Sequence, residues 1–325
     1  MTRSNPNFPS DLDIKPSSSV LNGFNQLSDD RFGADAQTQA IQAYGIAGRV
    51  WEASYAMLAY LDRASPTLDG HDVITLDPPP FTETIHLSGS TSEDDPLTIL
   101  ELGSGTGLVA ARIGAYLQHE RAIMVATDLP EVCSLLQKNL RGCATVEVHP
   151  LSWGSHQDAL SIASSLALGS ARRLAYIICS DLVYFPALLA PLLRTLLHLT
   201  SEPVVAPSQP PPRIIVSYKI RSLAKETSFW GAFGLWFTFA PVLARRRASG
   251  DGERNEGRWD RFVPVPGQDE TFVFIGHRRP ESRIWSIPED DEGLLGGVGA
   301  WGTMDHKVDD TFETMLLMSL GTMDE

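Results

Sequence analysis

Short apolar runs alternate with amphipathic stretches through the middle of this 325-residue chain. Six apolar runs, rich in β-branched residues, predict strands over 97–103, 123–129, 145–153, 176–184, 213–219 and 271–279. Five stretches between them have helical spacing and predict helices over 108–117, 130–140, 158–168, 186–199 and 228–236. Alternation of apolar strands with helices predicts an α/β fold, a mostly parallel sheet with helices on both faces.

The two ends of the chain differ from this middle part. Residues 1–40 are rich in Ser, Asn, Asp and Pro with little periodicity, which predicts a disordered segment. Helical spacing then begins in Gly48 to Leu61, so we expect one folded domain over 41–280. From residue 281 the chain is acidic and glycine-rich and predicts a disordered or weakly packed tail. An amphipathic helix over 311–320 that binds a partner is the alternative.

Two further segments interrupt the predicted domain. Residues 201–213 are proline-rich, and residues 245–260 are charged and contain glycine, so both are expected to be exposed insertions. Substrate choice often depends on such peripheral segments.

Charge and cysteine usage narrow the function classes. The net charge of −14 is concentrated in residues 281–325, which hold eleven acids and two bases. The predicted domain is nearly neutral and offers only Arg245 to Arg247 as a basic run, which makes nucleic acid an unlikely partner. Three scattered cysteines, a polar N-terminus and the absence of a long apolar segment predict a cytoplasmic protein without disulfides, metal or membrane contact.

The segment Glu101-Leu-Gly-Ser-Gly-Thr-Gly107 joins a predicted strand to a predicted helix, where a glycine loop can approach a nucleotide. Its G-x-G-x-G spacing places Leu108 where a dinucleotide fingerprint needs glycine, and the P-loop lysine is missing, so pyrophosphate binding is disfavoured. Asp128 ends the next strand 21 residues beyond Gly107, where its carboxylate can bind ribose hydroxyls. The alternative is an ordinary tight turn, with Asp128 capping the following helix.

ELGSGTG resembles motif I of the seven-β-strand methyltransferases, and TDLP around Asp128 resembles their ribose-binding motif. The resemblance extends to methyltransferase family 16, which methylates lysines on elongation factors, Hsp70-type chaperones and AAA ATPases. It covers about Gly45 to His277 and is carried by GRVWEASYAML, LSWG and SDLVY. The resemblance implies a Rossmann-like seven-stranded sheet, S-adenosylmethionine as cofactor and a protein substrate. We expect a monomer.

This resemblance implies that most of the site residues bind the cofactor. The glycine loop would lie along the methionine part, where missing side chains let the backbone come close. Asp128 would bind the ribose, Trp153 would bracket the adenine, and Trp51 would close over the cofactor. The residues expected to hold the cofactor are Trp51, Glu101, Gly103, Ser104, Gly105, Asp128, Leu129, Trp153 and Ser180.

Asp181 and Tyr184 are the expected catalytic residues, since they lie at the carboxyl end of a predicted strand, where open α/β sheets bind ligands. Methyl transfer is an in-line displacement by a neutral amine, so the protein mainly aligns the amine and stabilises the charge that develops on nitrogen. A carboxylate would accept a hydrogen bond from the amine, and a tyrosine hydroxyl would orient its lone pair. Residues 218–230 are expected either to shape a substrate groove or, at Phe229 and Trp230, to pack in the core.

Two other functions fit the same motifs. One is a small-molecule N- or O-methyltransferase, which a closed pocket would favour. The other is a non-catalytic cofactor-binding scaffold that recruits a partner through its acidic tail.

Overall fold

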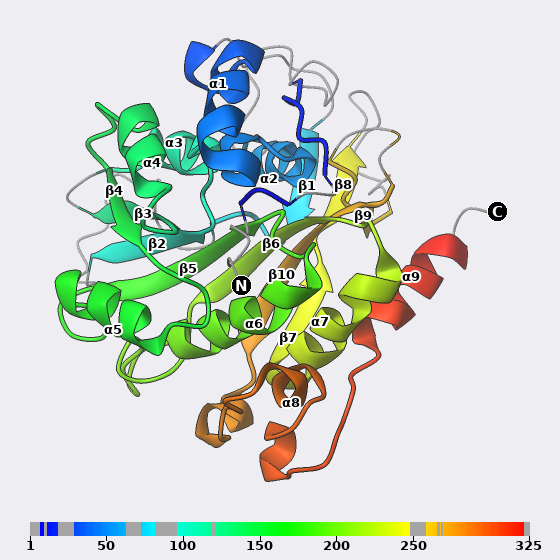
Figure 1. Ribbon diagram of the computed structural model, residues 1–325. Coiled ribbons are helices and arrows are strands. Elements are labelled where there is room, and N and C mark those ends of the chain that lie inside the picture. The colour runs from blue at the N-terminus through cyan, green and yellow to red at the C-terminus, as the bar shows by residue number, and fades with distance from the viewer. Residues whose placement is uncertain are drawn as a thin grey trace.

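A computed structural model describes residues 7–9, 12–18, 29–62, 73–81, 96–118, 121–247, 258–264, 267 and 269–321. Its centre is a seven-stranded sheet with helices on both sides, which confirms the predicted Rossmann-like fold class (Figure 1). The strands of this sheet are β2 (Leu97–Leu102), β3 (Ala122–Asp128), β4 (Val146–Pro150), β5 (Arg173–Ser180), β6 (Arg213–Lys219), β7 (Phe237–Pro241) and β10 (Thr271–Arg278).

The strand order β4-β3-β2-β5-β6-β10-β7 creates the position where a ligand is expected. The strands from β4 to β6 are parallel, whereas β10 runs antiparallel to its neighbours β6 and β7. The chain builds outward from β2 through β3 to β4, then crosses to β5 on the other side of β2. In open α/β sheets, ligands bind beyond the carboxyl ends of the strands at such a reversal.

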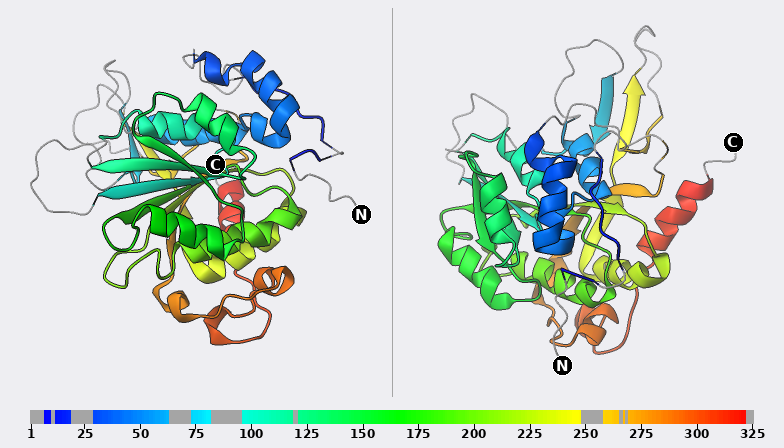
Figure 2. Two further views of the ribbon diagram at one scale, coloured as in Figure 1. Left: turned by 60° about the vertical axis from the view of Figure 1, so that its left-hand side comes forward. Right: turned by 45° about the horizontal axis from the view of Figure 1, so that its top comes forward.

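Helices bury the two faces of the sheet in separate apolar cores. One face is covered by α2 (Glu52–Asp62), α3 (Leu108–Gly114) and α4 (Cys133–Asn139), and the other by α5 (His156–Ser165), α6 (Pro186–Leu199) and α7 (Leu223–Trp236) (Figures 1 and 2). Residues 176–179 of β5 alternate between the cores, because strand side chains point to opposite faces. Ile177 and Cys179 face α6, whereas Ile178 faces α2.

The predicted domain start at residue 41 lies inside a helix. A 3₁₀ helix (η2, Asp30–Phe32) leads into α1 (Ala34–Tyr44), and a second 3₁₀ helix (η3, Gly45–Gly48) joins α1 to α2. Asn7 and Ser17, within the stretch predicted to be disordered, are buried. Hydrophobic patterning misses these contacts because polar groups make them. Residues 1–6, 10–11 and 19–28 of that stretch lie outside the described residues.

The acidic tail is also more ordered than its composition predicts. It forms η4 (Pro280–Ile284), α8 (Asp291–Leu295), η5 (Ala300–Gly302) and α9 (Thr311–Gly321), which lie along the outer side of α6 and α7 (Figure 1). Leu294 and Phe312 are buried there, and the Phe312 ring stacks on Trp230 with centroids 4.9 Å apart. A few buried apolar side chains hold this segment against the domain, so its high charge did not indicate that it is ordered.

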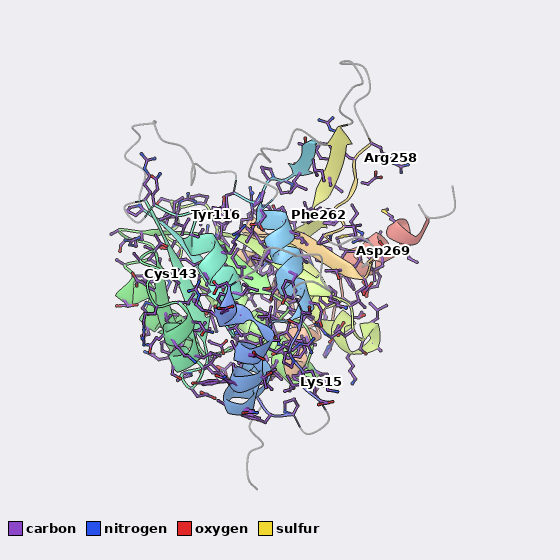
Figure 3. The ribbon with its side chains drawn as sticks, turned by 90° about the horizontal axis from the view of Figure 1, so that it is seen from above. Lys15, Tyr116, Cys143, Arg258, Phe262 and Asp269 are labelled. Carbon is purple, nitrogen blue, oxygen red and sulfur yellow. The ribbon has the colours of Figure 1, made fainter. Side chains whose placement is uncertain are left out.

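A second, three-stranded antiparallel sheet was not predicted. It joins β1 (Val73–Asp77), β8 (Leu243–Arg247) and β9 (Asp260–Arg261), and its last two strands lie at the ends of the segment 245–260 that was expected to be an exposed insertion. Phe262 anchors it beside α2, while Arg258 lies further out (Figure 3). Residues 201–213 form the predicted loop, although Val204 and Val205 are buried.

Candidate active site

A cavity of about 220 Å³ lies beyond the carboxyl ends of β2, β3 and β5, at the reversal in strand order. Its walls come from the glycine loop after β2, the segments that follow β3, β4 and β5, and the chain entering α2. All of the residues predicted for the site line this one cavity. They are Trp51, Glu101, Gly103, Ser104, Gly105, Asp128, Leu129, Trp153, Ser180, Asp181 and Tyr184.

The glycine loop presents bare backbone to the cavity. Gly103 and Gly105 have φ of +56° and +54°, a region that side-chain-bearing residues rarely adopt. A Cβ atom on Gly103 would lie 2.9 Å from atoms of both Trp153 and Leu182. Ser104 fixes the loop to β3, because its amide donates to the Thr127 carbonyl (2.9 Å) and its hydroxyl accepts from the Thr127 amide (3.2 Å). A side chain at Gly103 would therefore press on two residues of the cavity wall, Trp153 and Leu182.

Two buried carboxylates, those of Asp128 and Glu101, face the cavity and differ in their hydrogen bonding. Asp128 accepts hydrogen bonds from the Gly105 amide through Oδ2 and from the Leu129 amide through Oδ1, both at 2.8 Å. Oε2 of Glu101 accepts none from the described part of the chain. Burial raises the pKa of Glu101 to about 8 and that of Asp128 to about 6. A buried carboxylate oxygen without a donor is costly, so a hydrogen-bond donor or a cation next to Oε2 would stabilise the ionised form of Glu101.

Aromatic rings form the side of the cavity near α2. The rings of Trp51 and Tyr184 are almost parallel, at 12°, with centroids 6.4 Å apart. The Trp51 indole nitrogen donates to the Ile46 carbonyl (3.0 Å), and the guanidinium groups of Arg49 and Arg221 lie 4.5 and 5.5 Å from its ring centroid. Burial raises the pKa of Tyr184 well above its usual value, so this hydroxyl keeps its proton.

Asp181 is at the cavity, but its carboxylate already has partners. Both oxygens accept hydrogen bonds from the Arg221 guanidinium at 2.6 Å, and Oδ2 also accepts from the Ala53 amide at the start of α2 (3.2 Å). The Asp181 side chain is 0% exposed, and its backbone has a φ of +63°. Asp181 therefore ties the end of β5 to α2 and to Arg221, a contact that the sequence interpretation did not predict.

Asn7, Arg49, Ser54 and Leu188 are among the residues of the cavity wall that were not predicted from the sequence. Arg49 pairs with Glu52, and Glu52 lies 3.5 Å from Arg221, so the charges flanking Trp51 are linked. The i, i+3 spacing of Arg49 and Glu52 at a helix start was a usable signal. Ser54 accepts a hydrogen bond from the predicted Ser180 (3.1 Å), and nothing in the pattern indicated either Ser54 or Asn7.

Residues 218–230 belong mainly to the core. Phe229 and Trp230 are buried in the aromatic cluster under β6 and β10, so they cannot line a groove. The Tyr218 hydroxyl donates to Glu226, which also accepts from the backbone amides of Arg221 and Ser222. Glu226 thus fixes the turn that holds Arg221 next to Asp181.

Neither a metal-binding group of side chains nor a membrane-spanning helix occurs in the described part of the chain. In the described ranges, no three His, Cys, Asp or Glu side chains are grouped so that they could hold a metal ion. No helix among those same residues is long and apolar enough to cross a membrane.

The sequence of the chain is similar to sequences of known lysine methyltransferases. Residues 35–232 match the model of the lysine methyltransferase family. Protein N-lysine methyltransferase METTL21A from Xenopus tropicalis is 27% identical over 207 residues, which are 61% of this chain and 72% of that protein.

Solved structures resemble the chain only distantly. The DszA carbon methyltransferase is 15% identical, with a TM-score of 0.37, over 61% of this chain and 50% of that one. A putative O-methyltransferase from Klebsiella pneumoniae is 12% identical, with a TM-score of 0.36, over 80% of this chain and 96% of that one. The assignment rests on the sequence matches: the protein is an S-adenosylmethionine-dependent protein-lysine methyltransferase, and the chain belongs to the lysine methyltransferase family.

Proposed function

We propose that the cavity binds S-adenosylmethionine along the glycine loop and admits the target lysine beside Tyr184. The observation that carries this proposal is the free Oε2 of Glu101, buried beside a glycine loop that leaves room for a ligand. An ammonium group is the ligand feature that best satisfies a buried carboxylate. Asp128, Leu129 and Trp153 line the part of the cavity where a ribose and an adenine ring would bind.

When bound, the cofactor supplies a methyl group carried on a sulfonium, and the chain's own residues prepare the amine. Lysine is mostly protonated in water near pH 7, and a pocket that excludes water lowers its pKa. Because the Tyr184 hydroxyl stays protonated, its oxygen can accept an N–H of the neutral amine and so direct the lone pair. The facing rings of Trp51 and Tyr184 tolerate the positive charge that develops on nitrogen.

Asp181 acts in this proposal as a positioning residue. Its two oxygens hold Arg221, and Oδ2 also holds the first turn of α2, which places Trp51 next to Tyr184. This role replaces the direct contact with the amine that the sequence suggested, because the bidentate pair leaves the carboxylate little free capacity.

Calorimetric titration with S-adenosylhomocysteine tests the cofactor site. Asp128→Ala is expected to raise the dissociation constant about tenfold to a hundredfold, because hydrogen bonds to a charged group are each worth roughly 1.5–3 kcal/mol. Asp35→Ala, at an exposed position in α1, is the matched control and should bind like the wild type. A folded wild-type protein that does not bind this ligand would refute the proposed site.

The methyl acceptor requires a separate test with labelled cofactor and a lysate from a strain that lacks the enzyme. We propose that the label enters a lysine of elongation factor 1A, a chaperone or an ATPase in the cytoplasm, and that the enzyme acts as a monomer. Tyr184→Phe should keep its ligand affinity and lose most of this transfer. Label confined to the small-molecule fraction would favour the alternative of a small-molecule acceptor.

A further inference from the structure

The N-terminal strap, defined as residues 7–9 and 12–18, lies outside residues 35–232 that match the family model. Ser17 anchors it through buried hydrogen bonds. The Ser17 amide donates to Oε1 of Gln37 (3.0 Å), Nε2 of Gln37 donates to the Ser17 carbonyl (3.2 Å), and the Ser17 hydroxyl bonds to that of Tyr55 (3.0 Å). The strap is therefore attached to α1 and α2, beside which it lies in Figure 2.

At its other end the strap reaches the cavity. Asn7 is 6% exposed and lines the cavity wall. Its carbonyl accepts a hydrogen bond from the Ile46 amide (2.9 Å), and the Ile46 carbonyl accepts one from the Trp51 indole (3.0 Å). One residue, Ile46, thus connects the strap to the tryptophan proposed to cover the cofactor.

The backbone between α1 and α2 is shaped to receive the strap. Gly45 has a φ of +57°, and a Cβ atom there would lie 1.7 Å from the Asn7 carbonyl oxygen. The next turn contacts the glycine loop, because a Cβ atom on Gly105 would lie 3.0 Å from the Ala47 carbonyl oxygen. Strap, connecting turn and glycine loop therefore form one packed layer beside the cavity.

We infer that the strap is part of the cofactor site, with Asn7 as a binding residue and with Ile46 relaying the position of the strap to Trp51. This inference rests on the proposed function, since it assumes that the cavity holds S-adenosylmethionine. A polar segment anchored at Ser17 excludes water from this side of the cavity. That exclusion strengthens each hydrogen bond made to the cofactor.

Two substitutions test the strap by calorimetric titration with S-adenosylhomocysteine. Asn7→Ala removes the side chain from the cavity wall and should raise the dissociation constant about threefold to tenfold. Gly45→Ala adds a methyl group that would overlap the Asn7 carbonyl oxygen, so the strap must move away. This change should raise the dissociation constant about tenfold.

Each substitution has a matched control. Lys15→Ala changes an exposed strap residue, which lies at the periphery of the molecule in Figure 3. Gly142→Ala imposes the strain of a positive φ, +87°, at a site where an added Cβ meets nothing within 4 Å. Both controls should bind within about twofold of the wild type, the spread expected of surface changes.

Hydrogen exchange at the Ile46 amide gives a readout that does not depend on a substitution. Bound S-adenosylhomocysteine should slow this exchange in the wild type, because ligand and strap stabilise each other reciprocally. If Gly45→Ala does not fold, this exchange measurement and the affinity of Asn7→Ala still test the strap inference. The strap inference alone would be overturned if the wild type binds the ligand, Asn7→Ala binds it at least as tightly, and the ligand leaves hydrogen exchange at the Ile46 amide unchanged. Failure of the wild type to bind would overturn the proposed function instead.

Discussion

Glu101 makes the stability of the ligand-free protein depend on pH. Its pKa is raised from 4.5 to about 8 by burial, so the folded protein keeps a proton that the unfolded chain has released at neutral pH. The contribution of this raised pKa to stability is present below about pH 4.5 and is lost as the pH rises toward 8. Glu101→Gln should therefore gain stability over the wild type as the pH increases, by roughly 3–4 kcal/mol between pH 5 and pH 8. Thermal unfolding of both proteins between pH 5 and 8 checks this, and parallel curves would contradict it.

Ligand binding should show the opposite trend with pH. An ammonium group beside Glu101 favours the ionised carboxylate, so the affinity for S-adenosylhomocysteine should rise between about pH 6 and pH 8. Glu101→Gln should bind more weakly, with a flatter profile. Titrations at three pH values in this window suffice, and an unchanged profile in the variant would place the ammonium group elsewhere.

The pair of Asp181 and Arg221 separates a positioning role from a catalytic one. Asp181→Asn leaves the half-buried Arg221 guanidinium with only the more distant carboxylate of Glu52 as counter-charge and should cost about 3 kcal/mol of stability. If positioning is the role, Arg221→Gln should slow methyl transfer about as much as Asp181→Asn, and the double variant should be little worse than either. Single-turnover rates with a protein acceptor test this. An Arg221→Gln variant with wild-type rates beside an inactive Asp181→Asn would restore Asp181 as a direct catalytic group.

Sequence reasoning identified the site residues that belong to short motifs and missed those brought in by tertiary contact. The glycine loop, Asp128 and Asp181 follow strands, so their position at the sheet edge could be predicted from the strand pattern. The pairing of Asp181 with Arg221 joins the ends of β5 and β6 across 40 residues of sequence. Such pairings depend on side-chain direction at the sheet edge, which hydrophobic periodicity does not encode.

At the scale of elements, α9 is an integral part of the fold. Phe312 is 1% exposed and packs against Trp230, Tyr218 and Phe274. Phe312→Ala should destabilise the protein by about 3 kcal/mol, as is typical when a large aromatic ring leaves a buried site. Leu317→Ala, on the same helix but 70% exposed, should change stability by less than about 0.5 kcal/mol.

Urea denaturation of these two α9 variants gives the comparison, and titration with S-adenosylhomocysteine should show wild-type affinity for both. A loss below about 1 kcal/mol for Phe312→Ala would mean that α9 is only loosely attached, as the composition of the tail suggested.

The elements that sequence reasoning missed share a physical cause. Strand β7 follows directly on α7, so one apolar stretch from residue 229 to 241 contains both elements without a turn signal between them. Strands β1 and β8 pair with each other across about 170 residues; β1 has only five residues, and β8 is mostly arginine, so neither is recognised alone. The long strands of the central sheet were predictable because both of their faces are buried, which demands continuous apolar runs.

At the scale of the whole molecule, the two cores and the C-terminal segment should unfold together. The apolar core on the α6 side includes strand residues together with Leu294 and Phe312 of the tail, so no boundary divides sheet from tail. Saturation with S-adenosylhomocysteine at about a hundred times its dissociation constant stabilises the folded state by about 2.7 kcal/mol. That corresponds to a rise of roughly 5 °C in the midpoint of a single calorimetric transition. Two transitions, of which only one moved with ligand, would show that the tail folds separately from the methyltransferase core, and the Phe312 contact would then contribute little to the stability of the site.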